Sequence, residues 1–141
     1  MISGMETKSG MENRGGERIL LVDDEVQLTL MAKRLLEKSG YRVEEETNSM
    51  AALERFKTNP LRYDIVITDM KMPKLNGANL SRELLKIRPD IPIILCTGFS
   101  EEIDSELAEA IGIRAFVLKP VSRQILIEII RDILDRKPRR E

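Results

Sequence analysis

The stretch "ILLVDDE", residues Ile19 to Glu25, joins an apolar run directly to three adjacent carboxylates. The apolar run predicts a buried strand over residues 18–23 that reaches the surface at its acidic end. Like charges placed side by side at such a point are unfavourable unless a helix cap, a cation or a counter-charge offsets them. The three acids therefore either begin a helix or hold something positively charged.

The rest of the sequence continues this pattern, because short apolar runs alternate with segments of helical periodicity. The predicted strands are residues 18–23, 41–46, 63–69, 91–97 and 114–119, and the predicted helices are residues 26–39, 48–58, 78–87, 100–111 and 122–135. Strands that are apolar throughout need helices on both faces, which requires a parallel sheet. Right-handed crossovers with one change of winding direction then predict a doubly wound (βα)5 sandwich of the α/β class.

The ends of the chain differ in composition from its centre. Residues 1–16 hold four of the eight glycines without apolar periodicity, and we interpret them as a flexible leader or linker. Residues 17–136 form the single predicted domain. The basic residues 137–141 are expected to be a solvated tail, with a nucleic-acid or membrane contact as the alternative.

Composition excludes several classes of function. The 141 residues carry a net charge of -1, so there is no electrostatic footprint for direct binding to nucleic acid or an anionic membrane. The chain has no histidine, which removes histidine-based catalysis, and one cysteine, Cys96, which we expect to be a buried small side chain. No apolar stretch reaches the ~20 residues of a membrane span, and we expect a cytoplasmic protein.

Five polar residues stand where predicted strands end, and parallel strands bring their carboxyl ends to one edge of a sheet. These residues are Asp23, Asp24, Asp69, Thr97 and Lys119. The three carboxylates are hard oxygen ligands that suit Mg²⁺ or Mn²⁺. The alternative is that Asp23 or Asp24 only caps the next helix.

The other two strand-end residues also have two interpretations. Lys119 is either solvated or, opposite an acid cluster, binds a phosphoryl oxygen as a point charge. Pro120 follows it, and a cis bond there would aim the lysine inward. Thr97 is either an ordinary β-branched strand residue or a hydroxyl donor to a phosphoryl oxygen.

Five short motifs follow one another along the chain, namely "LLVDDE", "DIVITDMKMPKLNG", "ILCTG", the aromatic Phe116 and "LKP". Taken in this order they resemble the receiver domains of two-component response regulators, and the resemblance covers Arg18 to about Asp135. It implies a flavodoxin-like, five-stranded sheet in the order 2-1-3-4-5. The leader and the motif "CTGFSEE" further resemble receivers joined to hybrid sensor histidine kinases, although a stand-alone receiver fits as well.

The resemblance implies a role for each residue of the acid cluster. Asp69 becomes the phosphoacceptor, whose carboxylate attacks a phosphoryl group while Mg²⁺ and Lys119 stabilise charge on the phosphoryl oxygens. Asp24 ligates Mg²⁺ directly and Asp23 does so directly or through water. The backbone carbonyl of Lys71 supplies a further ligand.

The resemblance also implies a switch. Thr97 turns toward the aspartyl phosphate, and Phe116 follows into the space that Thr97 leaves. The phosphoryl lifetime is expected to depend on Lys71 and Phe99, and we hypothesise that Phe99 shields the aspartyl phosphate from water.

The implied output surface comprises the helix at 100–111, the strand at 114–119 and the helix at 122–135. Apolar residues cover about 200° of the last helix, which is wider than packing on a sheet requires. Either the helix is deeply covered, or an exposed strip around Ile127 and Leu134 meets a partner or a second copy. We expect the exposed strip.

A run of three glutamates and a single glycine also have expected roles. The three glutamates at residues 44–46 are expected to be a solvated edge, and Gly77 is expected to supply a turn conformation or room for a phosphoryl donor.

The predicted function is that of a signalling phosphoacceptor. A histidine kinase or phosphotransfer protein donates the phosphoryl group, and only self-phosphorylation and slow autodephosphorylation are expected of the chain itself. One alternative is a pseudo-receiver that binds a partner without phosphorylation. The other is a Mg²⁺-dependent phosphatase with an aspartyl nucleophile, against which the position of the isolated acid on the third strand argues.

Overall fold

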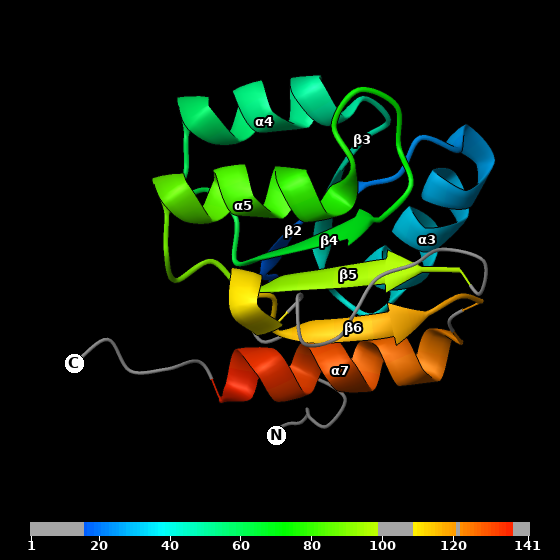
Figure 1. Cartoon of the computed structure of the whole chain (residues 1–141). Helices are drawn as coiled ribbons and strands as arrows, with labels where there is room; N and C mark the ends of the chain where they lie inside the picture. Colours follow the sequence, from blue (N-terminus) through cyan, green and yellow to red (C-terminus); the bar gives the residue numbers. More distant parts are fainter. Residues whose placement is uncertain (1–15, 99–108, 121, 137–141) are drawn as a thin grey trace.

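The computed structural model describes residues 16–98, 109–120 and 122–136 (Figure 1). The strands are β2 (Arg18–Val22), β3 (Arg42–Glu46), β4 (Ile65–Asp69), β5 (Ile93–Thr97) and β6 (Ala115–Leu118). The helices are α3 (Val26–Lys38), α4 (Ser49–Thr58), α5 (Gly77–Ile87) and α7 (Arg123–Asp135). Of the predicted helix 100–111, only residues 109–111 are described, and they are helical.

The five strands form one parallel sheet in the order β3-β2-β4-β5-β6. Numbered along the chain, this is the predicted order 2-1-3-4-5, so the doubly wound fold is confirmed. The register pairs Asp69 with Cys96 and Thr97 with Leu118. The ends of neighbouring strands therefore lie level with one another along one edge of the sheet.

The helices form two layers around the sheet (Figure 1). Side chains of α4 and α5 share one core cluster with strand residues such as Leu20 and Val66, and side chains of α3 and α7 share the other with residues such as Ile19 and Ile65. Alternate residues of the same strand thus point into opposite layers, as the pleat of a strand requires. Burying each such side chain contributes about 1.5–3 kcal/mol.

Three helices begin at a side-chain cap. The backbone N–H of Ala51 donates to Asn48, that of Asn79 to Asn76, and that of Ile125 to Ser122. Each bond pairs one of the free backbone N–H groups in the first turn of its helix. Such a cap typically contributes about 1 kcal/mol to stability. Each of these caps lies in the loop that leads from a strand into the next helix.

Helix α3 begins without such a cap. Glu25 occupies the N-cap position with no side-chain hydrogen bond, while Asp23 Oδ1 accepts the N–H of Glu25 at 3.0 Å. Neither Asp23 nor Asp24 therefore serves as the N-cap residue of α3. At the other end of α3, Gly40 has φ +100° and follows the C-cap Ser39, a position where helices commonly end with a glycine in the left-handed conformation.

The prediction of an exposed apolar strip around Ile127 and Leu134 is wrong. Leu134 is only 9% exposed, and Ile127 is half-buried against the core cluster shared by α3 and α7. Helix α7 lies alongside the sheet (Figure 1), and its Leu134 belongs to the core cluster while its Ile127 packs against that cluster. The exposed apolar residue of this helix is Ile125, at 51%.

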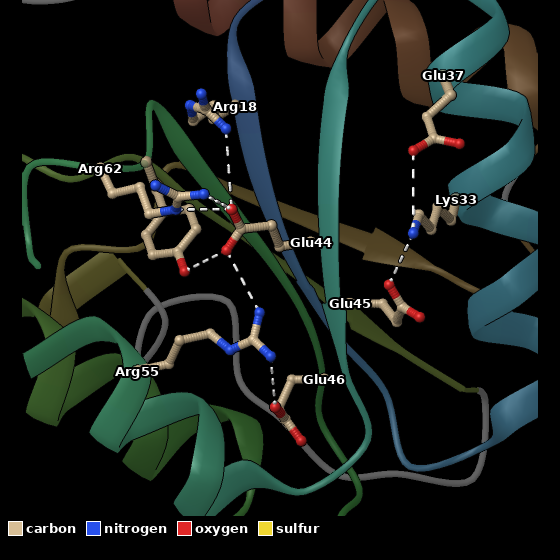
Figure 2. A network of polar contacts seen from close by, with 9 residues as sticks. Arg18, Lys33, Glu37, Glu44, Glu45, Glu46, Arg55 and Arg62 are labelled. Atoms are coloured by element: carbon tan, nitrogen blue, oxygen red, sulfur yellow. Dashed lines mark hydrogen bonds and ion pairs between the residues drawn. The ribbon is translucent and has the colours of Figure 1, made fainter. Parts of the chain in front are cut away.

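The three glutamates of β3 are not a solvated edge, and Figure 2 shows how they are paired. Arg62 Nε donates to Glu44 Oε2 at 2.6 Å, and the Tyr63 hydroxyl donates to Glu44 Oε1 at 2.7 Å. Arg55 reaches the same Oε1 at 3.3 Å. The Glu44 side chain is only 20% exposed, because basic residues from a neighbouring helix and loop close over this edge strand.

The other two glutamates have partners of their own (Figure 2). Glu46 pairs with Arg55 at 3.3 Å, and Glu45 pairs with Lys33 of α3 at 3.0 Å. The three acids thus join β3 to the helices on both faces of the sheet.

Among residues 16–98, 109–120 and 122–136, no helix is both long enough and apolar enough to cross a membrane.

Candidate functional site

Three carboxylates converge at the carboxyl edge of the sheet. Asp23 and Asp24 follow β2 directly, and Asp69 is the last residue of the neighbouring strand β4. One oxygen from each lies within 4.8 Å of the others. Asp69 is buried, Asp23 is half-buried and Asp24 is exposed, so the cluster runs from the interior of the sheet to the surface.

Lys119 is the counter-charge of this cluster. It follows β6 and places Nζ 2.8 Å from Asp69 Oδ1 and 3.9 Å from Asp23 Oδ2. Burial opposes its charged form, but the hydrogen bond to Asp69 and the charges of both aspartates outweigh burial and raise the pKa of Lys119. The bond between Lys119 and Pro120 is cis.

The surroundings of Asp23 disfavour its ionised form. Burial raises the pKa of this carboxyl, and the charges of Asp24 and Glu25 act in the same direction. The N–H of Glu25 and the charge of Lys119 offset only part of that rise. A further cation beside Asp23 would favour its ionised form.

The donor set fits a hard divalent cation. All three groups are carboxylates with oxygens close enough to share one ion, and Mg²⁺ prefers oxygen ligands with water in the remaining positions. A pocket of about 550 Å³ opens over the cluster and leaves room for such waters. Its lining residues are Asp24, Glu25, Asp69, Lys71, Met72, Pro73 and Lys119.

The structure brings some of the remaining predicted residues to the site. Lys71 lines the pocket and is exposed, while the ligand role of its carbonyl stays a prediction. Thr97 is buried at the end of β5, one strand away from Asp69. Phe116 is half-buried against the core cluster shared by α4 and α5. Phe99 lies outside the described residues.

The predicted turn conformation at Gly77 is wrong, since its φ is not among the positive values and it is the first residue of α5. The alternative, room for a phosphoryl donor, stays a prediction. A Cβ on Gly77 would collide with the backbone carbonyl oxygen of Asp69 and lie 2.7 Å from Leu95 Cδ1. Gly77 therefore lets α5 approach the end of β4 closely. Sequence alone carried no signal of this contact, because Asp69 and Gly77 meet only when the loop between them folds back.

Cys96 lies beside Asp69 in the sheet and is mostly buried, as predicted. Burial and the nearby charge of Asp69 raise the pKa of its thiol to about 12. The raised pKa favours the neutral thiol over the nucleophilic thiolate at physiological pH.

A second pocket, of about 590 Å³, reaches the same residues from the side of α3 and α7. Leu28, Met31 and Leu35 of α3 form one wall, and Leu126 and Ile127 of α7 form the other. Its inner end is at Asp69 and Lys119. Four of the exposed large apolar side chains of the described residues belong to α3, namely Val26, Leu28, Leu30 and Met31.

The chain thus folds as a (βα)5 sandwich. Its strand ends carry two adjacent acids, a buried aspartate and a lysine that precedes a cis-proline. The profile of the response regulator receiver domain matches residues 19–131. The chain belongs to the response regulator receiver domain family, the receiver modules of two-component systems.

Individual relatives agree with this assignment. The chain is 34% identical over 119 residues to chemotaxis protein CheY of Thermotoga maritima, an alignment that covers 84% of this chain and 98% of that one. It is 32% identical over 123 residues to sensor kinase CckA of Brucella abortus, which covers 87% of this chain and 13% of CckA. A crystal structure of a response regulator receiver domain protein from Clostridium thermocellum superposes with a TM-score of 0.82 at 38% identity, covering 86% of this chain and 96% of that one.

Proposed function

We propose that Asp69 accepts a phosphoryl group from a partner histidine kinase or phosphotransfer protein in a Mg²⁺-dependent reaction. The observation that carries this proposal is the position of Asp69. Its carboxylate is buried, 2.8 Å from the ammonium group of Lys119, and within reach of two further carboxylates. An acid so placed lies against a positive partner and faces a pocket from which a donor can approach.

The chemistry is a transfer between two nucleophiles. A carboxylate oxygen of Asp69 forms a bond to phosphorus, the phosphorus–nitrogen bond of the donor phosphohistidine breaks, and the imidazole nitrogen leaves with the electron pair. The partner must supply that imidazole, because this chain has no histidine. Lys119 lies where its ammonium can bind a phosphoryl oxygen in place of the Asp69 oxygen that it now contacts.

Asp23, Asp24, Asp69 and the backbone carbonyl of Lys71 are the residues that would hold the ion. Bound Mg²⁺ neutralises charge that builds up on the phosphoryl oxygens. The clustering of the three carboxylates supports this ligand set. Mn²⁺ has similar ligand preferences and would be an alternative.

Phosphorylation is proposed to act as a switch. Thr97 turns toward the aspartyl phosphate, and Phe116 moves into the space that Thr97 leaves. These movements favour one of two arrangements of the surface that includes β6 and α7. A partner or a second copy would read that surface. Leu118 and Ile125, which are both exposed, are better contact candidates there than Ile127. Lys71 and Phe99 are proposed to set the phosphoryl lifetime, with Phe99 excluding water.

The wider context is also a proposal. We infer a cytoplasmic signalling module that is phosphorylated rather than an enzyme that turns over a substrate. The match to 13% of sensor kinase CckA supports an origin as one part of a hybrid kinase. The match to nearly all of CheY from Thermotoga maritima supports a stand-alone receiver equally well.

The test is intact mass measured after incubation with acetyl phosphate, with and without Mg²⁺, for the wild type and Asp69→Asn. The expected result is a Mg²⁺-dependent gain of one phosphoryl group that Asp69→Asn abolishes. No gain from acetyl phosphate or from a phosphorylated histidine-containing partner would indicate a pseudo-receiver. Multiple turnover of a small phosphate ester would indicate a phosphatase.

A further inference from the structure

The hydroxyl of Thr29 connects α3 to the acidic turn. Thr29 is on the first turns of α3, and its side chain is only 1% exposed. Its Oγ1 lies 2.7 Å from the carbonyl oxygen of Glu25 and 3.0 Å from the carbonyl oxygen of Asp23. One side chain thus contacts the backbone of two of the three residues in "DDE".

The two contacts differ in meaning. A bond from a threonine hydroxyl to the carbonyl four residues earlier occurs in many helices and carries no information about a site. Asp23, in contrast, is six residues earlier and lies outside the helix, so the second contact joins α3 to the turn. The hydroxyl has one proton, which the two carbonyl oxygens must share.

Further bonds hold the same residue. The backbone N–H of Asp23 donates to the carbonyl of Glu46 at 3.2 Å, and Asp23 Oδ1 accepts the N–H of Glu25 at 3.0 Å. The carbonyl oxygen of Asp23 accepts from the hydroxyl of Thr29, so both the N–H and the carbonyl of this residue are hydrogen-bonded. The peptide that joins Asp23 to Asp24 is thereby oriented, and with it the direction in which Asp24 leaves the sheet.

We propose that Thr29 is a positioning residue of the acid cluster, and that its hydroxyl sets the affinity of the cluster for Mg²⁺. Thr29 touches neither the ion nor the phosphoryl group and acts through the backbone of Asp23. The inference rests on the proposed function, because it assumes that Asp23, Asp24 and Asp69 share one ion. Groups that orient metal ligands typically change metal affinity by about 10–100-fold when they are removed.

The experiment compares Mg²⁺ affinity in Thr29→Val, which loses the hydroxyl at nearly constant shape, with Thr29→Ser, which keeps it. Isothermal titration calorimetry with MgCl2 gives the Kd, and urea unfolding gives the stability of each variant. We expect Kd to rise about tenfold in Thr29→Val and to stay close to the wild-type value in Thr29→Ser. Thr58→Val is the matched control, since it removes a threonine bond to the carbonyl four residues earlier in α4, away from the site.

Each outcome decides the question. An unchanged Kd in Thr29→Val would overturn the inference and leave the proposed function standing, provided that the wild type binds Mg²⁺ and gains a phosphoryl group. A wild type that binds no Mg²⁺ would overturn both. An equal loss of Mg²⁺ affinity in Thr58→Val would show a general effect of helix stability, which also overturns the inference. If Thr29→Val does not fold, Thr29→Ala replaces it, with the same expected rise in Kd.

Discussion

At the scale of single residues, the site depends on the pairing of Asp69 with Lys119. An ionised carboxylate that is 6% exposed needs a positive partner, because burial without one costs several kcal/mol. Lys119 meets that need at 2.8 Å, and it does so from the end of a strand two positions away in the sheet. The same ammonium is therefore available both to the resting carboxylate and to a phosphoryl group.

Replacing this lysine separates its role from that of the metal ligands. In Lys119→Met we expect the rate of phosphorylation by acetyl phosphate at saturating Mg²⁺ to fall about 100-fold, since a preorganised positive charge is lost. The Kd for Mg²⁺ should not rise, because an ammonium group opposes a second cation. Phosphorylation followed by intact mass, with calorimetry for Mg²⁺, measures both. Lys57→Met, a change at an exposed lysine of α4, should leave both unchanged.

Gly77 shows a steric requirement at the same scale. Gly77→Ala should lower the free energy of unfolding by about 1–3 kcal/mol, because the new methyl group meets the carbonyl of Asp69 and must push α5 or β4 aside. Urea unfolding measures the change. Asn79→Ala, on the exposed side of the same helix turn, should alter stability by about 0.5 kcal/mol or less. Equal stability of Gly77→Ala and the wild type would show that α5 has room to move.

At the scale of elements, α3 has two separate functions. Its buried face packs on the sheet through residues such as Leu36, while Thr29 on the same face reaches the acidic turn. Its other face exposes apolar side chains beside the pocket that ends at Asp69. Exposed apolar residues clustered next to a reactive site are typical of a protein contact surface.

The exposed face of α3 can be tested with two phosphodonors. In Met31→Glu, whose side chain is 58% exposed in the wild type, we expect the rate of transfer from a phosphorylated histidine-containing partner to fall about tenfold. Phosphorylation by acetyl phosphate should be unchanged, because a small molecule needs no docking surface. Leu61→Asp is the control, since Leu61 is 81% exposed in the loop after α4. A loss with both donors would place the effect of Met31→Glu within the site itself.

The edge strand β3 gives a prediction about pH. Burial acts to raise the pKa of Glu44, but the hydrogen bonds from Arg62 and Tyr63 and the charges of Arg62 and Arg55 outweigh it and lower the pKa below 4.5. A carboxyl whose pKa is lowered on folding stabilises the protein above its unfolded pKa. That stabilisation disappears as the pH falls through the folded pKa.

We therefore expect Glu44→Gln to be less stable than the wild type by about 1–2 kcal/mol at pH 7. The difference should shrink steadily as the pH is lowered below about 4.5, where the wild-type carboxylate takes up a proton. Urea unfolding at a series of pH values measures it. Glu54→Gln, at an exposed glutamate of α4, provides the comparison. A stability difference that does not vary with pH would mean that shape rather than charge is what matters at Glu44.

At the scale of the whole molecule, the sheet joins distant segments of the chain into one site. Asp23 and Lys119 are separated by nearly the entire domain, yet both contact the region around Asp69 because β2, β4, β5 and β6 are parallel and aligned. Repulsion among the acids lowers stability unless something positive is bound. Binding of a divalent cation at this cluster would therefore be coupled to folding.

Mg²⁺ should thus raise the stability of the whole domain. At a free concentration 100 times the Kd, we expect the free energy of unfolding to increase by about 2.7 kcal/mol, with chelation reversing the gain. Thermal or urea unfolding with and without Mg²⁺ measures the increase. Asp24→Asn should remove most of it, whereas Lys57→Met should not. Stabilisation of equal size in Asp24→Asn would mean that the ion binds elsewhere.

Much of the fold and most of the candidate site could be predicted, since both depend on local patterns. Apolar runs of strand length, helical periodicity and right-handed crossovers predicted a doubly wound parallel sheet, and the family resemblance supplied its strand order. The sheet aligns Asp23, Asp24, Asp69 and Lys119 at one edge. The errors arose where neighbours distant in sequence decide the outcome. Leu134 is covered by the sheet, Glu44 is paired with residues of α4 and the following loop, and Gly77 meets the carbonyl of Asp69.

By itself, the sequence determined the alternation of strands and helices, and with it the edge where the acids gather, because periodicity and strand direction are properties of short segments. Only the tertiary structure decided which polar groups are paired and which apolar groups are covered. The contact from Thr29 to Asp23 and the apolar wall of α3 are examples. Such contacts depend on side-chain direction and helix placement at the level of an ångström, and the pattern of residue types does not contain that information.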